Sequence, residues 1–284
     1  MKILVLGSNG MAGHMITNYL KQQGHHVETC ARNNANYIID IEKTLVVLKN
    51  LISKEFDYII NCIGVLIGEA NKDPSRAVLV NSYFPHYLEQ TFYNTSTKLI
   101  HLSTDCVFDG QRGNYVESDI HTEMNFYGKS KSLGEINNNK DITFRMSIIG
   151  PELKTNGTGL LHWILNNSND TLDGWDNAWW NGITTLQLAK CIETYIKNPV
   201  ISGVYHLVNN EVYINKYELL CKVNNIYNLN KNIRQTKGPK TVNKVLIDTK
   251  NILDFNIPNY DKQLKELKEY SRPITDIERV NYLM

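Results

Sequence analysis

A tyrosine and a lysine that could act together on a proton stand four residues apart, at Tyr127 and Lys131. Residues at this spacing share one face of a helix, so we expect a cationic Lys131 to lower the pKa of Tyr127 and favour its phenolate. Thr104, which follows an apolar run upstream, can add a hydroxyl hydrogen bond. Together the three side chains can supply a proton to a carbonyl oxygen. Tyr227 and Lys231 have the same spacing, but they lie in a polar segment, and we interpret Tyr227 as a surface tyrosine.

A glycine-rich loop near the N-terminus supplies the context for these residues. The apolar run at residues 2–6 is typical of a buried parallel strand, and residues 14–23 have the apolar spacing of a helix. The glycines between them permit a tight turn and the close approach of a pyrophosphate, whose charge is stabilised by N–H groups at the helix start. Their G-x-x-G-x-x-G spacing is one residue longer than the common fingerprint. The predicted dinucleotide-binding residues of this loop are Gly7, Asn9, Gly10, Met11 and Gly13.

The composition argues against several other classes of protein. The chain has 284 residues and a formal net charge of +1, which shows no overall bias towards nucleic acid or a membrane surface. No run approaches the roughly 20 apolar residues of a membrane span, so we expect a cytoplasmic protein. Five cysteines are scattered without C-x-x-C spacing, which argues against a disulfide framework or a zinc site. The oligomeric state stays open, with a homodimer as one option.

Strand and helix patterns alternate through the first half of the chain. Further buried strands are predicted at residues 27–30, 58–62, 98–102 and 142–146, and helices at residues 40–51 (with a neighbouring loop), 75–93 and 127–136. This alternation predicts an α/β protein with a Rossmann-type, doubly wound parallel sheet, in which ligands bind beyond the carboxyl ends of the strands. Gly7, Asn61 and Thr104 each stand at such an end.

The alternation fades after about residue 150. The later patterns predict a short helix at residues 159–166, an aromatic-rich connection at 175–182, a helix at 186–197, a strand at 203–208 and a helix that starts at 216. We therefore expect residues 1–150 to form an NAD(P)-binding domain, to which later segments return. Residues 151–284 are expected to form mainly a smaller substrate-binding lobe.

Three motifs, in this order, resemble those of the extended short-chain dehydrogenase/reductases. They are the glycine loop, the Ser-Thr-Asp-Cys-Val-Phe-Asp-Gly segment at residues 103–110, and Tyr-Gly-Lys-Ser-Lys at residues 127–131. The second motif is most similar to the dTDP-4-dehydrorhamnose reductase group, and the resemblance covers roughly residues 1–210. It implies reduction, by NADPH or NADH, of the C4 keto group of a nucleotide-linked 4-keto-6-deoxyhexose. The sugar could be linked to dTDP or to UDP, and it could carry a 2-acetamido group.

The resemblance also implies roles for individual residues. Tyr127 would be the general acid that protonates the C4 oxygen, Lys131 would hold the nicotinamide ribose and tune Tyr127, and Thr104 would hydrogen-bond the carbonyl. The matching cofactor positions outside the glycine loop are Asp40, Ile41, Asn61, Cys62, Gly64 and Asn81. Ordinary capping is the alternative interpretation of the Asp and Asn residues in this set.

The residue after the second strand bears on the choice of cofactor. An acidic side chain there binds the ribose hydroxyl of NAD, whereas an arginine favours the phosphate of NADP. This chain has Arg32 and no carboxylate at that place, which favours NADPH. NADH stays open, because a surface arginine is the ordinary alternative.

Substrate contacts are predicted less directly. Asp105, Trp163 and Trp180 are candidates beside Thr104 and Tyr127, since aromatic faces stack on sugars and bases. Tryptophans, however, more often close a lobe against the main core. Lys154 and Lys244 are candidates for a diphosphate.

Position 106 separates the reaction types. The pair Asp105-Cys106 stands where sugar 4,6-dehydratases carry Asp-Glu, which argues against dehydration. A cysteine there resembles bifunctional epimerase-reductases such as GDP-L-fucose synthase, in which a thiol of lowered pKa exchanges protons beside the keto group. The companion histidine is not at the matching place, and His162 is displaced by a few residues. An epimerase-reductase that uses Cys106, and a non-catalytic NADPH-binding regulatory subunit like the partner of methionine adenosyltransferase, stay as alternatives.

Overall fold

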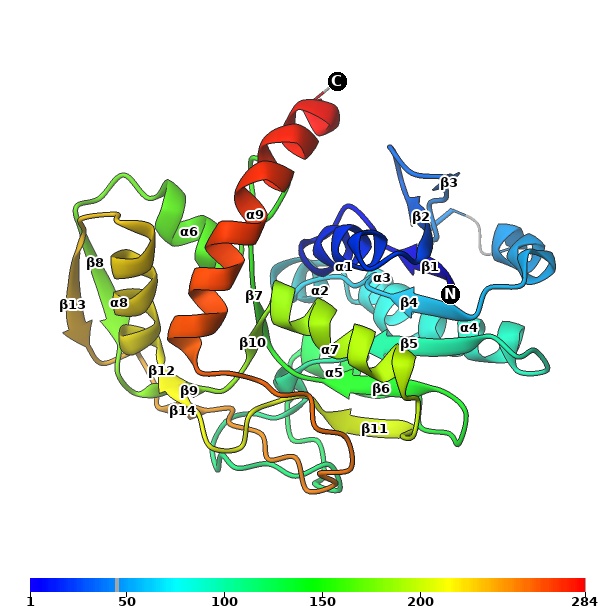
Figure 1. Cartoon of the computed structure of the whole chain (residues 1–284). Helices are drawn as coiled ribbons and strands as arrows, with labels where there is room; N and C mark the ends of the chain where they lie inside the picture. The colour runs from blue at the N-terminus through cyan, green and yellow to red at the C-terminus, as the bar shows by residue number, and fades with distance from the viewer. Residues whose placement is uncertain (44–45, 284) are drawn as a thin grey trace.

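A parallel sheet of seven strands is the centre of the computed structural model, which describes residues 1–43 and 46–283 (Figure 1). Its order is β11-β6-β5-β4-β1-β2-β3. The strands are β1 (Lys2–Leu6), β2 (His26–Ala31), β3 (Tyr37–Ile38), β4 (Tyr58–Asn61), β5 (Lys98–Leu102), β6 (Ile142–Arg145) and β11 (Gly203–His206). The predicted Rossmann-type α/β sheet is confirmed. The strand order reverses between β1 and β4, the position at which such sheets bind ligands.

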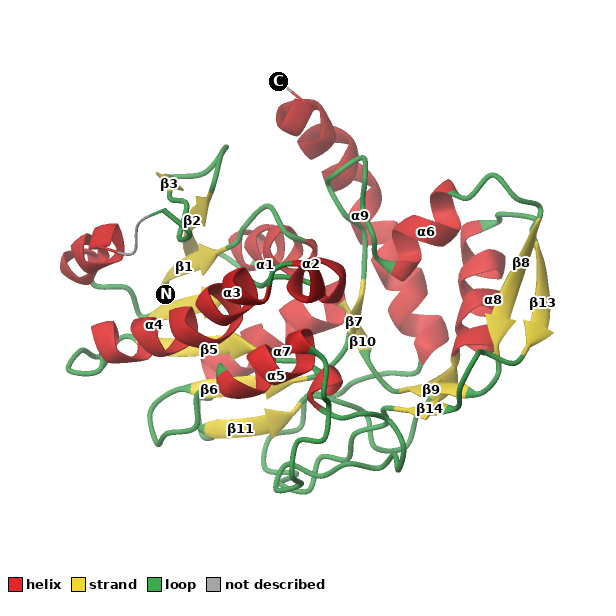
Figure 2. Cartoon of the chain, turned by 180° about the vertical axis from the view of Figure 1, so that it is seen from behind, coloured by secondary structure: helices red, strands yellow, loops and turns green. Residues whose placement is uncertain are grey.

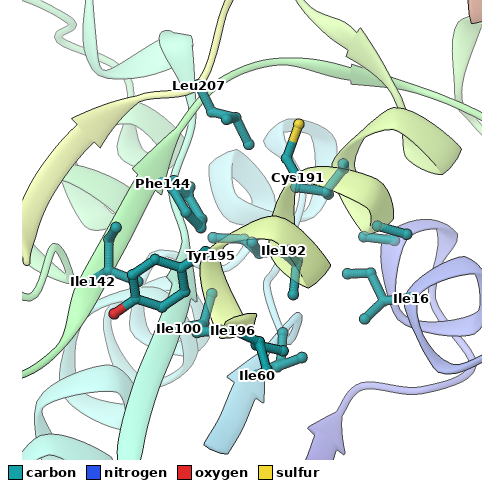
Figure 3. Packing of buried hydrophobic residues seen from close by; sticks show 14 of the residues in the cluster. Ile16, Ile60, Ile100, Ile142, Phe144, Cys191, Ile192, Tyr195, Ile196 and Leu207 are labelled. Atoms are coloured by element: carbon teal, nitrogen blue, oxygen red, sulfur yellow. The ribbon is translucent and has the colours of Figure 1, made fainter. Parts of the chain in front are cut away.

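Helices cover both faces of this sheet. α1 (Met11–Gln22) and α7 (Thr185–Lys197) pack on one face, and their apolar side chains form one core with alternate strand residues. Figure 3 shows Cys191, Ile192 and Tyr195 of α7 lying over Ile142 and Phe144 of β6. Each fully buried Ile, Leu or Phe side chain in this core stabilises the fold by about 1.5–3 kcal/mol relative to an exposed one. The return of α7 and β11 to the sheet thus closes a large apolar surface.

The opposite face is covered by a long helix and by α5 (Phe126–Leu133) (Figure 2). The single helix predicted at residues 75–93 consists of α3 (Pro74–Ala77), a π-helical segment (Val78–Tyr83) and α4 (Phe84–Phe92). The short helix α2 (Ile67–Lys72) precedes it. The prediction of a helix at residues 40–51 is wrong for its first part, because residues 41–43 form a turn. A 3-10 helix follows at Val46–Lys54, and residues 44 and 45 lie outside the described part.

A second group of elements packs beside the sheet. It contains α6 (Leu160–Asn166), α8 (Lys216–Tyr227), α9 (Tyr260–Leu283), the parallel pair β8 (Thr171–Trp175) and β13 (Asn232–Thr236), and the sheet β12 (Ile214–Asn215), β9 (Ala178–Trp180), β14 (Val242–Asn243). The pair β7 (Ile148–Ile149) and β10 (Ile183–Thr184) connects it to the main sheet. Its own core includes Trp180, Leu219 and Leu264. In the described residues, no helix is long and apolar enough to cross a membrane.

Tyr227 corrects one sequence interpretation. It ends α8, is half-buried against the core of the second group, and has the ammonium of Lys268 5.6 Å from its ring centroid. The interpretation as a surface tyrosine is therefore wrong. Asn228 adopts a left-handed conformation and ends the helix, so Lys231 lies beyond it. The Lys231 ammonium instead donates to the carbonyl oxygens of Asn167 and Asn169.

Candidate functional site

The glycine loop joins β1 to α1 in a conformation that residues with a side chain rarely adopt. Gly7 has a φ of +76°, and its N–H donates to the Cys30 carbonyl oxygen at 2.8 Å. A Cβ atom on Gly13 would lie 2.1 Å from the carbonyl oxygen of Gly7. The helix therefore packs directly on the loop because both positions lack a side chain.

The same loop fits the pyrophosphate of a dinucleotide. Gly10 caps α1 with its backbone alone, so the first N–H groups of the helix face the loop without a side-chain acceptor from the cap. Asn9 donates to the Asn33 carbonyl oxygen at 2.8 Å and ties the loop to the segment after β2. Met11 lies against the second group of elements, since a Cβ atom on Gly159 would be 2.6 Å from its methyl carbon.

The segment after β2 carries the other residues predicted near the adenosine. Arg32 follows β2 directly and is exposed. Asp40 accepts from the Glu42 N–H at 3.2 Å and pairs with Lys43 at 3.6 Å, which is the arrangement of a capped turn. Ile41 is buried in the core under α4 and contributes to packing.

Two buried asparagines hold the turn after β4. Asn61 contacts His101 Nδ1 at 3.1 Å and accepts from the Ile63 N–H at 3.1 Å. Asn81 accepts from the Val65 N–H at 2.8 Å and donates to the Val65 carbonyl oxygen at 3.0 Å. Because Asn81 lies inside the π-helical segment, the capping interpretation is wrong for it. Together the two side chains fix the segment that contains Cys62 and the exposed Gly64.

Thr104 and Tyr127 meet at the carboxyl end of β5. Thr104 is buried, and its Oγ1 accepts from the Cys106 N–H at 3.1 Å and donates to Asp105 Oδ1 at 3.2 Å. Tyr127, in the first turn of α5, lies beside Thr104, whose side chain acts to lower the pKa of the phenol. A Cβ atom on Gly128 would lie 2.4 Å from the Cys106 carbonyl oxygen, so α5 presses closely against this segment. The sequence motifs 103–110 and 127–131 thus converge on one site.

Lys131 lies one turn further along α5 and is also buried. Its ammonium donates to the Leu102 carbonyl oxygen at 2.7 Å. Burial lowers the pKa of Lys131 to about 8, although Glu135 and Cys62 act in the opposite direction.

The ionisation of Tyr127 differs from the sequence expectation. Burial raises the pKa of Tyr127 above its ordinary value, and Cys106 and Asp105 act in the same direction. The expectation that Lys131 favours a phenolate is wrong for this structure, because desolvation of the phenol and the neighbouring Cys106 and Asp105 all raise its pKa, and only the Thr104 side chain acts to lower it. Tyr127 is a neutral phenol at pH 7, which is the form that can donate a proton.

Two lysines that come from later in the chain face Asp105 and Cys106. Lys244 interacts with the Cys106 thiol and with Asp105, and it pairs with Glu123 at 3.5 Å. Lys216 interacts with Asp105 and Cys106, and its ammonium lies 5.6 Å from the centroid of the Trp180 ring. The thiol is a weak acid here, since burial and Asp105 raise the pKa of Cys106 to about 12.

The RmlD substrate-binding-domain family matches residues 1–246. The chain belongs to this family. Among curated relatives, dTDP-4-keto-6-deoxy-D-glucose reductase of Streptomyces niveus is 29% identical over 213 residues, which are 72% of this chain and 71% of the relative. Methionine adenosyltransferase 2 subunit beta of Xenopus tropicalis is 25% identical over 248 residues, or 80% of this chain and 72% of the relative.

Solved structures share the fold of this RmlD-family chain. A dTDP-4-dehydrorhamnose reductase from Bacillus anthracis, in complex with NADP, superimposes with a TM-score of 0.81 at 19% identity and covers 95% of this chain and 99% of its own. The corresponding reductase from Clostridium acetobutylicum has a TM-score of 0.77 at 19% identity, with 95% and 99% covered.

The tryptophans of this RmlD-family chain differ in their exposure. Trp180 is buried, and its ring stacks on Tyr260 with centroids 5.5 Å apart. Since Lys216 lies over the same ring system, Trp180 closes the second group of elements and is not an open platform. Trp163 on α6 is 40% exposed. Lys154 is exposed.

His162 is not a partner for Cys106 in the described structure. Its ring lies beside Gly157, where a Cβ atom would be 2.7 Å from it, and Glu152 lies at the same place. Within residues 1–43 and 46–283, no cluster of three or more His, Cys, Asp or Glu side chains could hold a metal ion.

A buried charged network beside the site was not predicted from the sequence. Arg145, at the end of β6, is 2% exposed and pairs with Glu135 at 2.6 Å. It also contacts His121 and His206, and Ser103 donates to Glu135. A signal was present, because an arginine in a run read as a buried strand needs an acidic partner.

Proposed function

We propose that this protein is an NADPH-dependent reductase of the C4 keto group of a nucleotide-linked 4-keto-6-deoxyhexose. The observation that carries the proposal is that Tyr127 lies beside the buried Thr104, with Lys131 one helical turn away, at the carboxyl end of β5. A neutral phenol beside a hydroxyl can donate a proton to a carbonyl oxygen. Several relatives are named as reductases of dTDP-linked sugars, which supports the same function.

Cofactor binding is assigned to the loops at the switch point of the sheet. The backbone of Gly7, Gly10 and Gly13 and the start of α1 accommodate the pyrophosphate, with Asn9 and Met11 at its rim. Arg32 is the candidate for the 2′-phosphate, and Asp40 flanks the adenine. Asn61, Cys62, Gly64 and Asn81 shape the wall beneath the nicotinamide. When bound, NADPH supplies the hydride.

The remaining chemistry belongs to three side chains. Tyr127 donates its phenolic proton to the C4 oxygen as negative charge develops there. Thr104 hydrogen-bonds the same oxygen and keeps the phenol oriented. Lys131, cationic below pH 8, holds the nicotinamide ribose and stabilises the phenolate that forms, until a proton from the solvent restores the phenol.

The substrate is assigned to the second group of elements. We propose residues 1–150 as the cofactor domain, with α7 and β11 returning to it, and residues 151–284 mainly as the substrate lobe. Asp105, Lys244 and the exposed Trp163 are the candidate contacts. The dTDP-linked sugar is the default substrate, and UDP-linked and 2-acetamido sugars stay within the proposal, as does a homodimer.

The test is a substrate panel. The protein is incubated with NADPH or NADH and a set of dTDP- and UDP-linked 4-keto sugars, and the loss of absorbance of the reduced cofactor is followed. Faster oxidation of NADPH than of NADH with one of these sugars supports the proposal. Absence of oxidation with every sugar, in protein that binds NADPH, contradicts it.

The epimerase-reductase alternative predicts one further outcome. In deuterated water, a base at Cys106 would introduce label at C3 or C5 of the sugar. Its raised pKa makes this thiol a poor base, so we expect reduction without label.

The regulatory-subunit alternative has one observation in its favour, the likeness to methionine adenosyltransferase 2 subunit beta over 80% of the chain. A regulator has no need for Thr104, Tyr127 and Lys131 together. NADPH binding without turnover on any keto sugar would favour this alternative.

A further inference from the structure

We propose that Glu135 is a positioning residue that fixes Thr104 and Lys131 relative to one another. This inference rests on the proposed reductase function, since it concerns the geometry of the same site. Glu135 follows the end of α5, four residues after Lys131, and its side chain is 6% exposed.

The carboxylate of Glu135 contacts the residue that follows β5. Its Oε1 accepts from the Ser103 hydroxyl at 2.6 Å, and Ser103 is the residue before Thr104. The Lys131 ammonium donates to the Leu102 carbonyl oxygen, at the end of β5, at 2.7 Å. Leu102 and Ser103 are consecutive, so two bonds from one helix and its C-terminal extension clamp the backbone that carries Thr104.

Arg145 holds Glu135 in place. Its Nε donates to Oε1 at 2.9 Å and its Nη2 to Oε2 at 2.6 Å, a bidentate pair that fixes the plane of the carboxylate. Arg145 also donates to His206 Nε2 at 2.7 Å and to His121 Nε2 at 2.8 Å. Because these ring nitrogens accept hydrogen bonds from a cation, both rings are neutral.

The network links three strand ends to α5. Arg145 comes from β6, His206 from β11 and Ser103 from the residue after β5, while His121 lies in the loop before α5 and contacts Ser132 at 2.5 Å. A buried ion pair contributes little net stability compared with apolar packing. The ion pair instead fixes a unique arrangement of the strand ends under the catalytic groups.

Charge gives Glu135 an effect that a purely structural residue lacks. The groups that face the Lys131 ammonium are Glu135, Cys62 after β4 and His101 of β5. Removing the charge of Glu135 while its shape is kept must lower the pKa of Lys131, because Glu135 is the largest influence that raises it.

The experiment compares Glu135→Gln with Glu193→Gln. Glu193 is a matched control, since its side chain is also 6% exposed and ion-paired, with His25 and Lys197 on the α1–α7 side of the sheet. We expect E135Q to lose about tenfold or more in kcat while KM for the sugar changes by less than about threefold, as a misplaced catalytic group affects the rate more than binding. E193Q should keep both values.

A second readout does not need turnover. The ionisation of Lys131 is followed by NMR of protein labelled at the lysine side chains, with Lys131→Met to assign the signal. We expect a midpoint near pH 8 in the wild type and a midpoint lower by about one pH unit in E135Q. If the wild type reduces none of the sugars, the proposed function fails, and this titration still decides the role of Glu135.

Ser103→Ala covers the case in which E135Q does not fold. It removes one hydrogen bond and leaves the Glu135–Arg145 pair, so we expect about a threefold or greater loss in kcat with the Lys131 midpoint unchanged. Folded E135Q with wild-type kcat and wild-type midpoint would overturn the proposal. So would an unfolded E135Q together with S103A of unchanged kcat.

Discussion

At the scale of the residue, the decisive property is that the site keeps Tyr127 neutral and Lys131 only weakly basic. Both effects come from burial, and neither follows from sequence spacing. Spacing alone predicts the opposite change for the phenol. A proton donor with a raised pKa suits a reduction, in which the substrate oxygen becomes strongly basic only as hydride arrives.

Substitution of Tyr127 by Phe tests this assignment. We expect kcat to fall by on the order of a hundredfold or more while NADPH affinity stays near that of the wild type, because only the proton donor is lost. Initial rates and fluorescence titration of NADPH measure the two effects. Tyr227→Phe is the matched control, since it makes the same change in the other Tyr-x-x-x-Lys pair. Equal rates for Y127F and the wild type would remove Tyr127 from the mechanism.

Substitution of Cys106 by Ala tests the thiol separately. Because the pKa of Cys106 is raised to about 12, the thiol carries no charge at neutral pH and cannot serve as a base. We expect C106A to retain turnover within about fivefold of the wild type, through loss of packing and of the Lys244 contact alone. Rates and deuterium incorporation in the product are measured together. Deuterium at C3 or C5 with the wild type, and none with C106A, would contradict this expectation.

At the scale of the element, the glycine loop fixes the distance between β1 and α1. Gly13→Ala places a methyl group 2.1 Å from the Gly7 carbonyl oxygen, so the helix must move away. We expect loss of about 1–3 kcal/mol in unfolding free energy, and at least tenfold weaker NADPH binding, since the helix N-terminus shifts. Chemical denaturation and NADPH titration measure these changes.

Gly68→Ala is the control for this prediction. Gly68 lies within α2, and a Cβ atom there would have no neighbour within 4 Å in the described structure. Alanine is the better helix former, so G68A should be neutral or slightly stabilising. Equal NADPH affinity for G13A and G68A would show that the close packing at Gly13 is not required.

Strands and helices could be predicted from the sequence where one local pattern of residues was enough to identify them. The buried strands β1, β4, β5 and β6 are short, mainly apolar runs, and each was found, as was the partly exposed strand β2. The segments β8 and β13 were missed, because residues such as Thr171 and Asn232 become strand only by pairing with each other. The same holds for the site: Thr104, Tyr127 and Lys131 are visible as motifs. Lys216 and Glu135 are not, because their roles depend on contacts between distant segments.

At the scale of the whole molecule, buried thiols make stability depend on alkaline pH. Desolvation raises the pKa of four thiols to about 12: those of Cys30 and Cys191, which are buried, and those of Cys62 and Cys106, which are partly buried. In the unfolded chain these thiols ionise near pH 8.5. The folded state therefore binds more protons above that pH, and this contribution to stability is complete below pH 8.5 and lost as pH rises towards 12. Lys131, Lys140 and Lys216 have lowered pKa values and act in the opposite direction, but the thiols outnumber them.

Urea unfolding in reducing buffer between pH 7.5 and 10.5 tests this prediction. We expect the unfolding free energy to fall over this range. Cys191→Ala should be less stable at pH 7.5 by about 1 kcal/mol and should show a shallower pH dependence, because one thiol that titrates only on unfolding is gone. Identical slopes for C191A and the wild type would show that buried thiols do not set the alkaline limit.

The place of β11 at the edge of the sheet has a consequence for synthesis of the chain. β6 pairs with β5 on one side and with β11 on the other, and α7 covers the apolar face over both. While the ribosome is still adding the residues between β6 and β11, the nascent chain exposes an unpaired edge of β6 and an uncovered apolar surface. Such surfaces recruit chaperones or self-associate. The order in which the segments are synthesised, and not only the contacts of the folded state, thus determines when the chain is protected against aggregation.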